Sequence, residues 1–326
     1  MSVCGRRRGA IPILVMLLLA LIGRAGAARA ADPARIYLIP KGTQHLFWRT
    51  VHAGAQQAAD DLGARLYYRG PGEDDNRSGQ ALLLRRAIDQ GYDGIVLAPS
   101  HDRQSVPLVA EARARGIAVV VIDSQLVDGQ QQSFVATDNY LGGVRAGQAL
   151  RQALADSGRV LLLRYLAGNA STERREQGFI DALRGSGVEI VHQGYVGASV
   201  GEALRNSLAL LEQAGPLDGV FAPNESATEG LLKALKTSRR LGQLKVVGFD
   251  YSPALWDSLK RGELAALVLQ QPYQIGYTGV QAVLAAINHH PMPAQLWIDS
   301  VVVDGSNYDA AAVQAIIQQT ARSATE

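Results

Sequence analysis

Polar side chains stand directly after four short apolar runs of this chain. Asp123 follows the run 119–122 and Asp250 follows the run 245–249, while Asn224 follows Ala-Pro and Gln270 follows Leu-Val-Leu. A carboxylate accepts two hydroxyl hydrogen bonds, and a carboxamide donates and accepts at once, so these groups suit a ligand rich in hydroxyls. Simpler interpretations stay open, because Asn224 could cap the helix that follows it and an aspartate after a strand often only forms a turn.

Two aromatic residues and an arginine extend this set. Phe47 and Trp48 open a predicted helix at 46–62, in which apolar residues recur at steps of three and four. Large rings can cover the C–H faces of a sugar ring. Adjacent residues cannot both point to one side of a helix, so we expect one of these rings to lean over a cleft. Arg175, in a predicted helix at 173–185, could donate paired N–H bonds to a ring oxygen and a hydroxyl.

The elements that position these residues alternate along the chain. From residue 34 onward, short β-branched runs alternate with segments of helical length, which is typical of an α/β protein with parallel sheets. The predicted strands are 35–39, 66–68, 94–97, 117–122, 160–164, 188–195, 219–222, 245–249 and 264–269. The predicted helices are 46–62, 76–90, 104–115, 139–156, 173–185, 200–214, 225–237 and 273–288.

An internal repeat indicates two similar lobes. The segment 92–100 recurs, one residue shorter, at 217–224, and the segment 119–124 is echoed at 245–250. The order and spacing persist through several elements, as in a duplicated unit. Parallel strands of each lobe would then present their carboxyl ends to a cleft between the lobes, which is a usual place for a small-molecule site.

The N-terminus predicts export. Three arginines at 6–8, an apolar run at 11–22 and the small-residue site Ala-Arg-Ala at 28–30 are typical of a secretory signal peptide, here residues 1–30. The apolar run is shorter than the about 20 residues that span a bilayer. Residues 1–30 hold five arginines, no acidic residue and the single cysteine, Cys4, so their removal changes the formal net charge from +2 to −3. The basic balance of the whole chain therefore gives no reason to expect a nucleic-acid partner.

Five motifs together resemble those of a known family. The segments are 138–143, 175–179, 220–225, 246–250 and 270–276. In this order they resemble the periplasmic sugar-binding proteins of the ribose and galactose type, and the likeness runs from about residue 36 to past 303. The resemblance implies the fold of a periplasmic binding protein of type I: two similar Rossmann-like lobes with parallel sheets, a hinge of three segments and a ligand cleft between the lobes.

The resemblance also implies a set of ligand contacts and a division of the chain. Phe47 and Trp48 fall on aromatic stacking positions, His45 falls on a polar contact just before them, and Lys41 lies in the same loop. The other polar contacts are Asp123, Arg175, Asn224, Asp250 and Gln270. The crossovers would lie near Thr137, Gln270 and Pro293, which gives a first lobe of 33–136 plus 271–293 and a second lobe of 137–270 plus 294–326.

Three departures from ribose binders leave the ligand open. Lys41 stands where they have a small hydroxyl residue, and Ser124 stands where they have an arginine. The segment 196–198 replaces an aromatic residue of the second lobe, for which Tyr195 is the nearest substitute. A pentose, a hexose, a polyol and an acidic sugar derivative all remain candidates.

The predicted function is binding without chemistry. We expect a monomer that captures a monosaccharide or polyol in the periplasm by hinge closure and delivers it to the membrane permease of an ABC importer. A sensor that passes its closed form to a chemoreceptor or sensor kinase is the alternative. An enzyme is disfavoured because no G-x-G-x-x-G loop follows the first predicted strand and no metal-ligand spacing occurs, so neither a cofactor nor a metal is expected. A DNA-binding regulator is disfavoured because the signal peptide occupies the place of a helix-turn-helix.

Overall fold

Two sheets of six strands organise the described part of the chain, and their strands follow the same order. The first sheet runs β2-β1-β3-β4-β5-β11 and the second runs β7-β6-β8-β9-β10-β12. All neighbours pair in parallel except β10 and β12, which are antiparallel. The matching order confirms the predicted α/β fold and the two similar lobes.

The strand bounds are as follows. The first sheet contains β1 (Arg35–Ile39), β2 (Arg65–Tyr68), β3 (Gly94–Leu97), β4 (Ala118–Ile122), β5 (Ser133–Thr137) and β11 (Gln295–Ile298). The second contains β6 (Ser157–Arg164), β7 (Gly187–Tyr195), β8 (Gly219–Phe221), β9 (Lys245–Phe249), β10 (Ala266–Leu269) and β12 (Val301–Asp304).

The computed structural model describes residues 1–2 and 32–322. The predicted signal peptide therefore lies outside the described residues, except for its first two. Among the helices that are described, none combines the length and the apolar character needed to cross a lipid bilayer.

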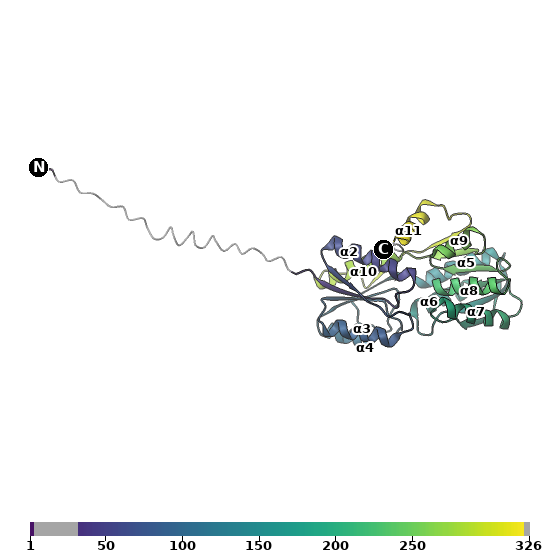
Figure 1. Cartoon of the computed structure of the whole chain (residues 1–326), viewed down its shortest axis with the longest axis horizontal. Coiled ribbons are helices and arrows are strands. Elements are labelled where there is room, and N and C mark those ends of the chain that lie inside the picture. The colour runs from purple at the N-terminus through teal and green to yellow at the C-terminus, as the bar shows by residue number, and fades with distance from the viewer. Residues whose placement is uncertain (3–31, 323–326) are drawn as a thin grey trace. The chain divides into compact units, whose positions relative to one another are not determined.

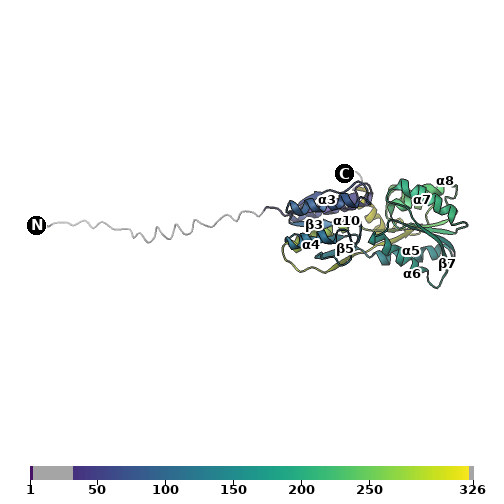
Figure 2. The same cartoon turned by 90° about the horizontal axis from the view of Figure 1, so that it is seen from below.

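Helices cover both faces of each sheet (Figures 1 and 2). On the first sheet, α2 (Leu46–Leu62) and α10 (Pro272–Ile287) lie on one face, and α3 (Arg77–Asp89) and α4 (Val106–Ala114) lie on the other. On the second sheet, α5 (Asn139–Ala153) and α6 (Ala170–Leu183) lie opposite α7 (Val200–Gln213), α8 (Glu225–Thr237) and α9 (Pro253–Lys260). The last helix, α11 (Ala311–Arg322), packs Val313 and Ile317 into the core of the second sheet. We call each sheet with its helices the first and the second lobe.

The inner strands of both sheets are largely apolar because both faces of each sheet are buried there. In β1, Ile36 and Leu38 join the core under α2 and α10, whereas Tyr37 and Ile39 join the core under α3 and α4. Successive side chains of a strand point to opposite faces, so a sheet covered on both sides reads as a continuous apolar run.

The sequence repeat contains an Asp-Gly pair, Asp93-Gly94 and Asp218-Gly219, whose aspartate makes the same hydrogen bond in both lobes. The Oδ2 atom of Asp93 accepts a hydrogen bond from the Arg35 N–H at 2.7 Å, and that of Asp218 accepts one from the Arg159 N–H at 2.7 Å. Arg35 lies at the start of β1 and Arg159 near the start of β6. The sequence repeat thus corresponds to a structural repeat at the amino ends of the central strands.

The chain passes between the lobes three times, and one predicted crossover is wrong. The passages follow β5 at Thr137, β10 at Leu269 and β11 at Ile298. The crossover predicted near Pro293 comes too early, because Gln295–Ile298 forms β11 and pairs in parallel with β5 of the first lobe. Residues 294–298 therefore belong to the first lobe. The strands β5, β11 and β12 and the helices α9 and α11 were not predicted.

Glycines allow two helix pairs to pack at very short range. A Cβ at Gly54 of α2 would overlap the Tyr273 carbonyl of α10, and one at Gly276 would overlap the Val51 carbonyl of α2. In the second lobe, Gly143 of α5 and Gly178 of α6 are related in the same way. Each lobe thus contains one helix pair in which backbone meets backbone.

The first prediction concerns this close packing. Gly276→Ala should lower the free energy of unfolding by about 2 kcal/mol or more, because the added methyl must displace the backbone of α2. That cost outweighs the roughly 1 kcal/mol that alanine gains in a helix. Urea unfolding measures the change. Gly72→Ala is the control, because an added Cβ there meets no atom within 4 Å; equal stabilities of the two variants would contradict the prediction.

Candidate functional site

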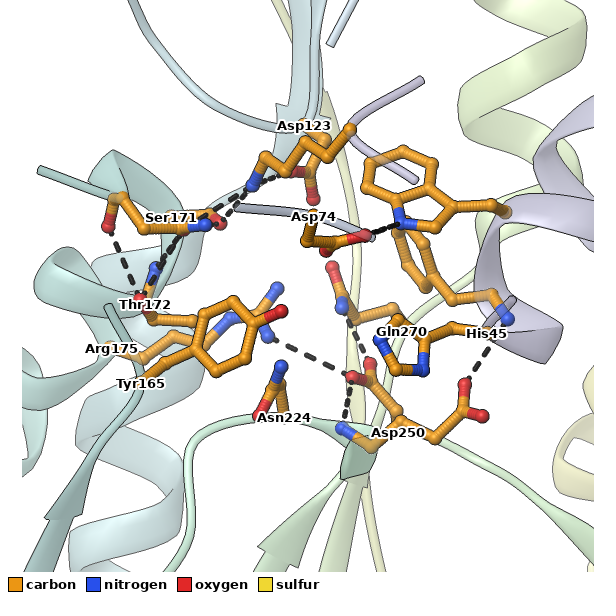
Figure 3. A pocket seen from close by; sticks show the side chains of 15 residues that line it. His45, Asp74, Asp123, Tyr165, Ser171, Thr172, Arg175, Asn224, Asp250 and Gln270 are labelled. Atoms are coloured by element: carbon orange, nitrogen blue, oxygen red, sulfur yellow. Dashed lines mark hydrogen bonds and ion pairs between the residues drawn. The ribbon is translucent and has the colours of Figure 1, made fainter. Parts of the chain in front are cut away.

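One cavity brings together all nine residues that the sequence singled out (Figure 3). About 350 Å³ of space without protein atoms lies among its side chains, including the part that is open to solvent. The nine are Lys41, His45, Phe47, Trp48, Asp123, Arg175, Asn224, Asp250 and Gln270, and the further lining residues are Asp74, Tyr165, Asn169, Ser171, Thr172 and Glu225. Both lobes contribute, so the cavity lies where the two lobes meet.

The two aspartates enter the cavity from matching positions of the two sheets. Asp123 follows β4 and Asp250 follows β9, the fourth strand of each sheet in the shared order. Both adopt the left-handed backbone conformation, with φ of 62° and 71°. Residues other than glycine adopt this conformation at some cost and often at functional sites, where the surrounding structure holds them in place.

The Asp250 carboxylate is held by donors from its own lobe. Gln270 donates from Nε2 to Oδ1 at 2.6 Å, the Glu225 N–H donates to Oδ2 at 3.0 Å, and the Arg175 guanidinium lies 3.9 Å from Oδ2. Burial raises the pKa of Asp250, and these partners oppose the rise. Asn224 serves both interpretations at once, since its Oδ1 caps α8 at the Ala227 N–H while the residue lines the cavity.

Lys41 is buried and joins the two lobes. Its Nζ atom lies 2.6 Å from Asp123 Oδ2 in the first lobe and donates to Asn169 Oδ1 at 3.2 Å and Ser171 Oγ at 3.0 Å in the second. These three partners use the three N–H donors of an ammonium group. Ser124, which stands in place of an arginine, accepts a bond from the Ser171 N–H at 3.1 Å. Lys41 therefore acts within a protein network, and its charge is already neutralised by Asp123.

Arg175 also makes hydrogen bonds within its own lobe. Its Nε donates to Asn139 Oδ1 at 2.8 Å, and its Nη1 donates to the Pro223 carbonyl at 2.9 Å. The guanidinium lies over the Phe249 ring, 4.1 Å from the ring centre. These contacts fix the plane of the guanidinium at the edge of the cavity.

Aromatic rings line the cavity from both lobes. Phe47 and Trp48 meet edge to face at the start of α2, with ring centres 4.9 Å apart, and Trp48 Nε1 donates to Asp74 Oδ1 at 3.1 Å. In the second lobe the aromatic residue is Tyr165, whose hydroxyl donates to the Ala198 carbonyl at 3.3 Å. Tyr165 points into the cavity in Figure 3.

Tyr195 does not substitute for the missing aromatic of the second lobe. Its side chain is 44% exposed at the end of β7, and the Arg164 guanidinium lies 4.7 Å from its ring centre. Tyr165 follows β6, a central strand whose carboxyl end faces the cavity, whereas β7 is the outermost strand of the second sheet. Its position directly after a central strand is the signal in the sequence that could have identified Tyr165.

Several further functional candidates come from loops that were not predicted to contribute to the site. Asp74 follows β2 and is buried, and burial raises its pKa. Asn169 precedes α6 and caps it by accepting a bond from the Thr172 N–H. Among the described residues, Asn169 Nδ2 and Gln270 Oε1 are buried polar atoms of this cavity without a hydrogen-bond partner. One is a donor and the other an acceptor, so a bound molecule with hydroxyl groups can satisfy both.

The architecture defines a class of protein: two duplicated α/β lobes that enclose a polar, aromatic-walled cavity at their strand ends. Residues 36–291 match the family described as the periplasmic binding protein domain. That match spans most of the chain, and the protein belongs to this family. The described residues contain no group of three His, Cys, Asp or Glu side chains placed to hold a metal ion.

Individual relatives agree with this assignment. The chain is 27% identical to the ribose import binding protein of Haemophilus influenzae over 286 residues, which cover 87% of this chain and 96% of that protein. It is 38% identical to the periplasmic component of an ABC-type sugar transport system from Hahella chejuensis, with a TM-score of 0.80 over 82% of this chain and 99% of that one. An ABC transporter solute-binding protein of Agrobacterium vitis, solved with bound D-fucose, is 31% identical, with a TM-score of 0.83 over 86% and 99% of the two chains.

The second prediction tests the buried ion pair. Lys41→Met should lower the free energy of unfolding by about 3 kcal/mol, because it leaves the Asp123 carboxylate buried without its cation. Adding Asp123→Asn to the same chain should restore much of this loss. Urea unfolding of both single variants and the double variant gives the coupling between the two side chains. Additive losses would show that the two side chains do not depend on each other.

Proposed function

We propose that this protein captures a neutral sugar or a related polyol in the periplasm and delivers it to the membrane permease of an ABC importer. The observation that carries the proposal is the cavity itself, in which carboxylates and carboxamides of both lobes lie between aromatic residues. Hydroxyl groups match the polar groups, and the C–H faces of a sugar ring match the aromatic ones. The relatives named as sugar-import or solute-binding proteins support the same proposal.

The charges of the cavity favour a neutral ligand over a sugar acid. Its acidic residues are Asp74, Asp123, Glu225 and Asp250, and its lysine and arginine are Lys41 and Arg175. Both cations already contact protein groups, with Lys41 on Asp123 and Arg175 on Asn139 and the Pro223 carbonyl. A ligand carboxylate would therefore meet an acidic surplus without a free cation. The acidic sugar derivative left open by Lys41 is not part of the proposal.

Binding and release follow from the arrangement of the lobes. Hydrogen bonds that cross between the lobes include Asp102 N–H to the Gly168 carbonyl, Arg77 Nη2 to the Ala167 carbonyl, and Ser171 N–H to Ser124 Oγ. They describe a closed arrangement, and opening must break them. Hinge closure around a ligand at the three chain passages is a known form of domain motion. A ligand that contacts both lobes shifts the population toward the closed form.

A role as a sensor receives less support than import. The relatives described above are named for import or solute binding, and none of them is named as a sensor. We infer that the protein binds as a monomer, without turnover and without a cofactor. The N-terminal residues 1–30 would be removed on export.

The third prediction concerns ligand class. In a thermal-shift panel of pentoses, hexoses, polyols and sugar acids, one or a few neutral compounds should raise the melting temperature, because a ligand that binds only the folded state stabilises it. Sugar acids should give no shift. The stabilising sugar should be recovered unchanged after prolonged incubation, as measured by NMR spectroscopy. Stabilisation by acids alone would contradict the charge argument, and no shift with any compound would contradict the sugar proposal.

The fourth prediction concerns Asp250. Asp250→Ala should weaken binding of the stabilising sugar by about 2 kcal/mol or more, which is the scale of charge-assisted hydrogen bonds lost in a buried site. Calorimetric titration measures the change. Asp257→Ala, an exposed aspartate on α9 of the same lobe, is the matched control and should bind like the wild type. Equal affinities of all three proteins would remove Asp250 from the site.

A further inference from the structure

The helix α2 has no side-chain cap of its own. It begins after His45, whose side chain makes no capping hydrogen bond, and the first turn of a helix leaves four N–H groups without an intrahelical partner. The N–H groups of Trp48 and Arg49 reach the His45 carbonyl at 3.2 and 3.5 Å. The N–H groups of Leu46 and Phe47 precede these, and they donate hydrogen bonds to a side chain of the second lobe.

Glu225 of the second lobe supplies that partner. Its Oε1 atom accepts the Leu46 N–H at 3.2 Å, and its Oε2 atom accepts the Phe47 N–H at 3.2 Å. Both bonds join residues about 180 positions apart in the chain. A carboxylate at a helix N-terminus also interacts favourably with the helix dipole. Glu225 therefore caps α2 across the boundary between the lobes.

The same residue is tied to the ligand-binding candidates of its own lobe. Glu225 follows Asn224 at the start of α8, and its own N–H donates to Asp250 Oδ2 at 3.0 Å. On the other side, its carboxylate contacts the turn of α2 that carries Phe47 and Trp48. Glu225 thus connects Asp250 of the second lobe, through its N–H group, to the turn of the first lobe that carries Phe47 and Trp48, through its carboxylate.

On the basis of the proposed function, we propose that Glu225 is a positioning residue that couples lobe closure to ligand binding by capping α2 across the cleft. In the closed form the cap fixes the first turn of α2 and the rings it carries. When the lobes separate, the cap is lost and the two N–H groups return to water. Closure is thereby stabilised by a contact that the ligand does not make itself.

The surroundings of Glu225 predict a pH dependence of closure. His45 faces it from the α2 side and Asp250 from the β9 side, and Arg175 contacts Asp250 in turn. Burial raises the pKa of Glu225 to about 7, against an ordinary value of 4.5, although His45 and the two N–H groups oppose the rise. Because separation of the lobes returns the group to water, the closed form binds a proton more readily than the open form. Closure should therefore strengthen as the pH falls from about 8 to about 6.

The experiment compares three variants with the wild type. Glu225→Gln keeps the size but places an amide N–H₂ against a backbone donor, and Glu225→Asp is too short to reach α2. Glu202→Gln is the matched control, because Glu202 caps α7 through the Ala198 and Ser199 N–H groups of its own lobe. Spin labels at Leu82→Cys on α3 and Glu212→Cys on α7, both exposed positions, report the distance between the lobes in a Cys4→Ser background.

Distances are measured between pH 5 and 8 without sugar and with D-ribose or D-fucose as the probes. At pH 5, where the closed form holds a protonated Glu225, both Glu225 variants should show a smaller closed fraction than the wild type and about tenfold weaker affinity for any probe that binds. In the wild type, protonation of Glu225 should strengthen the affinity about tenfold between pH 8 and pH 6. Glu225→Gln should lose this gain. Glu202→Gln should keep both the affinity and its pH dependence, whatever its effect on unfolding.

The outcomes separate this proposal from the sugar proposal. Equal closed fractions of the wild type and both Glu225 variants, in every condition, would overturn the role of Glu225. If neither probe changes the wild-type distance while the Glu225 variants still differ from the wild type, the cross-lobe cap stands and these two sugars are excluded as ligands. A similar loss of closure in Glu202→Gln would overturn the proposal, because any helix cap would then have the same effect.

Discussion

The rest of the site depends on the burial of charged groups where the two lobes meet. Lys41, Asp123, Arg175 and Asp250 are all buried, and a buried charge is tolerated only when it is paired and hydrogen-bonded. Lys41 meets this condition by contacting Asp123 in its own lobe and Asn169 and Ser171 in the other. The closed arrangement is thus part of what satisfies these charges, so the burial of the charges and the closure of the lobes depend on each other.

The duplicated architecture explains why the same solution appears twice. Each sheet presents an aspartate after its fourth strand in a left-handed conformation, and each aspartate lies near a buried cation. The two pairs differ in strength: Lys41 contacts Asp123 at 2.6 Å, whereas Arg175 stays 3.9 Å from Asp250. Asp250 therefore relies on Gln270 and the Glu225 N–H, and its network leads directly to the cap on α2. The repeat thus places an aspartate at the same edge of both sheets, but the two aspartates are held by different partners.

Much of this organisation could be predicted from the sequence because it depends on local pattern. The apolar steps at 46–62 predicted α2 with its observed bounds, and strand-end positions identified Asp123, Asn224, Asp250 and Gln270. Position after an inner strand was enough here because the carboxyl ends of parallel strands share one edge. The same rule applied to β6 would have indicated Tyr165. The expectation that Tyr195 replaces the missing aromatic residue was wrong, because an outermost strand can direct its last side chain toward solvent.

The sequence by itself determined the two lobes and their parallel sheets, because periodicity and repetition are properties of short segments. Of the nine cavity residues, strand-end position indicated Asp123, Asn224, Asp250 and Gln270, the starts of predicted helices indicated Phe47, Trp48 and Arg175, and the family resemblance added Lys41 and His45. The tertiary structure decided what those residues do to one another. It placed β11 with the first sheet, neutralised Lys41 with Asp123, brought Asp74 and Asn169 into the cavity and set Glu225 on the start of α2. These outcomes depend on contacts between residues that are far apart in the chain, and such contacts leave no periodic signal because they form only when the two lobes meet.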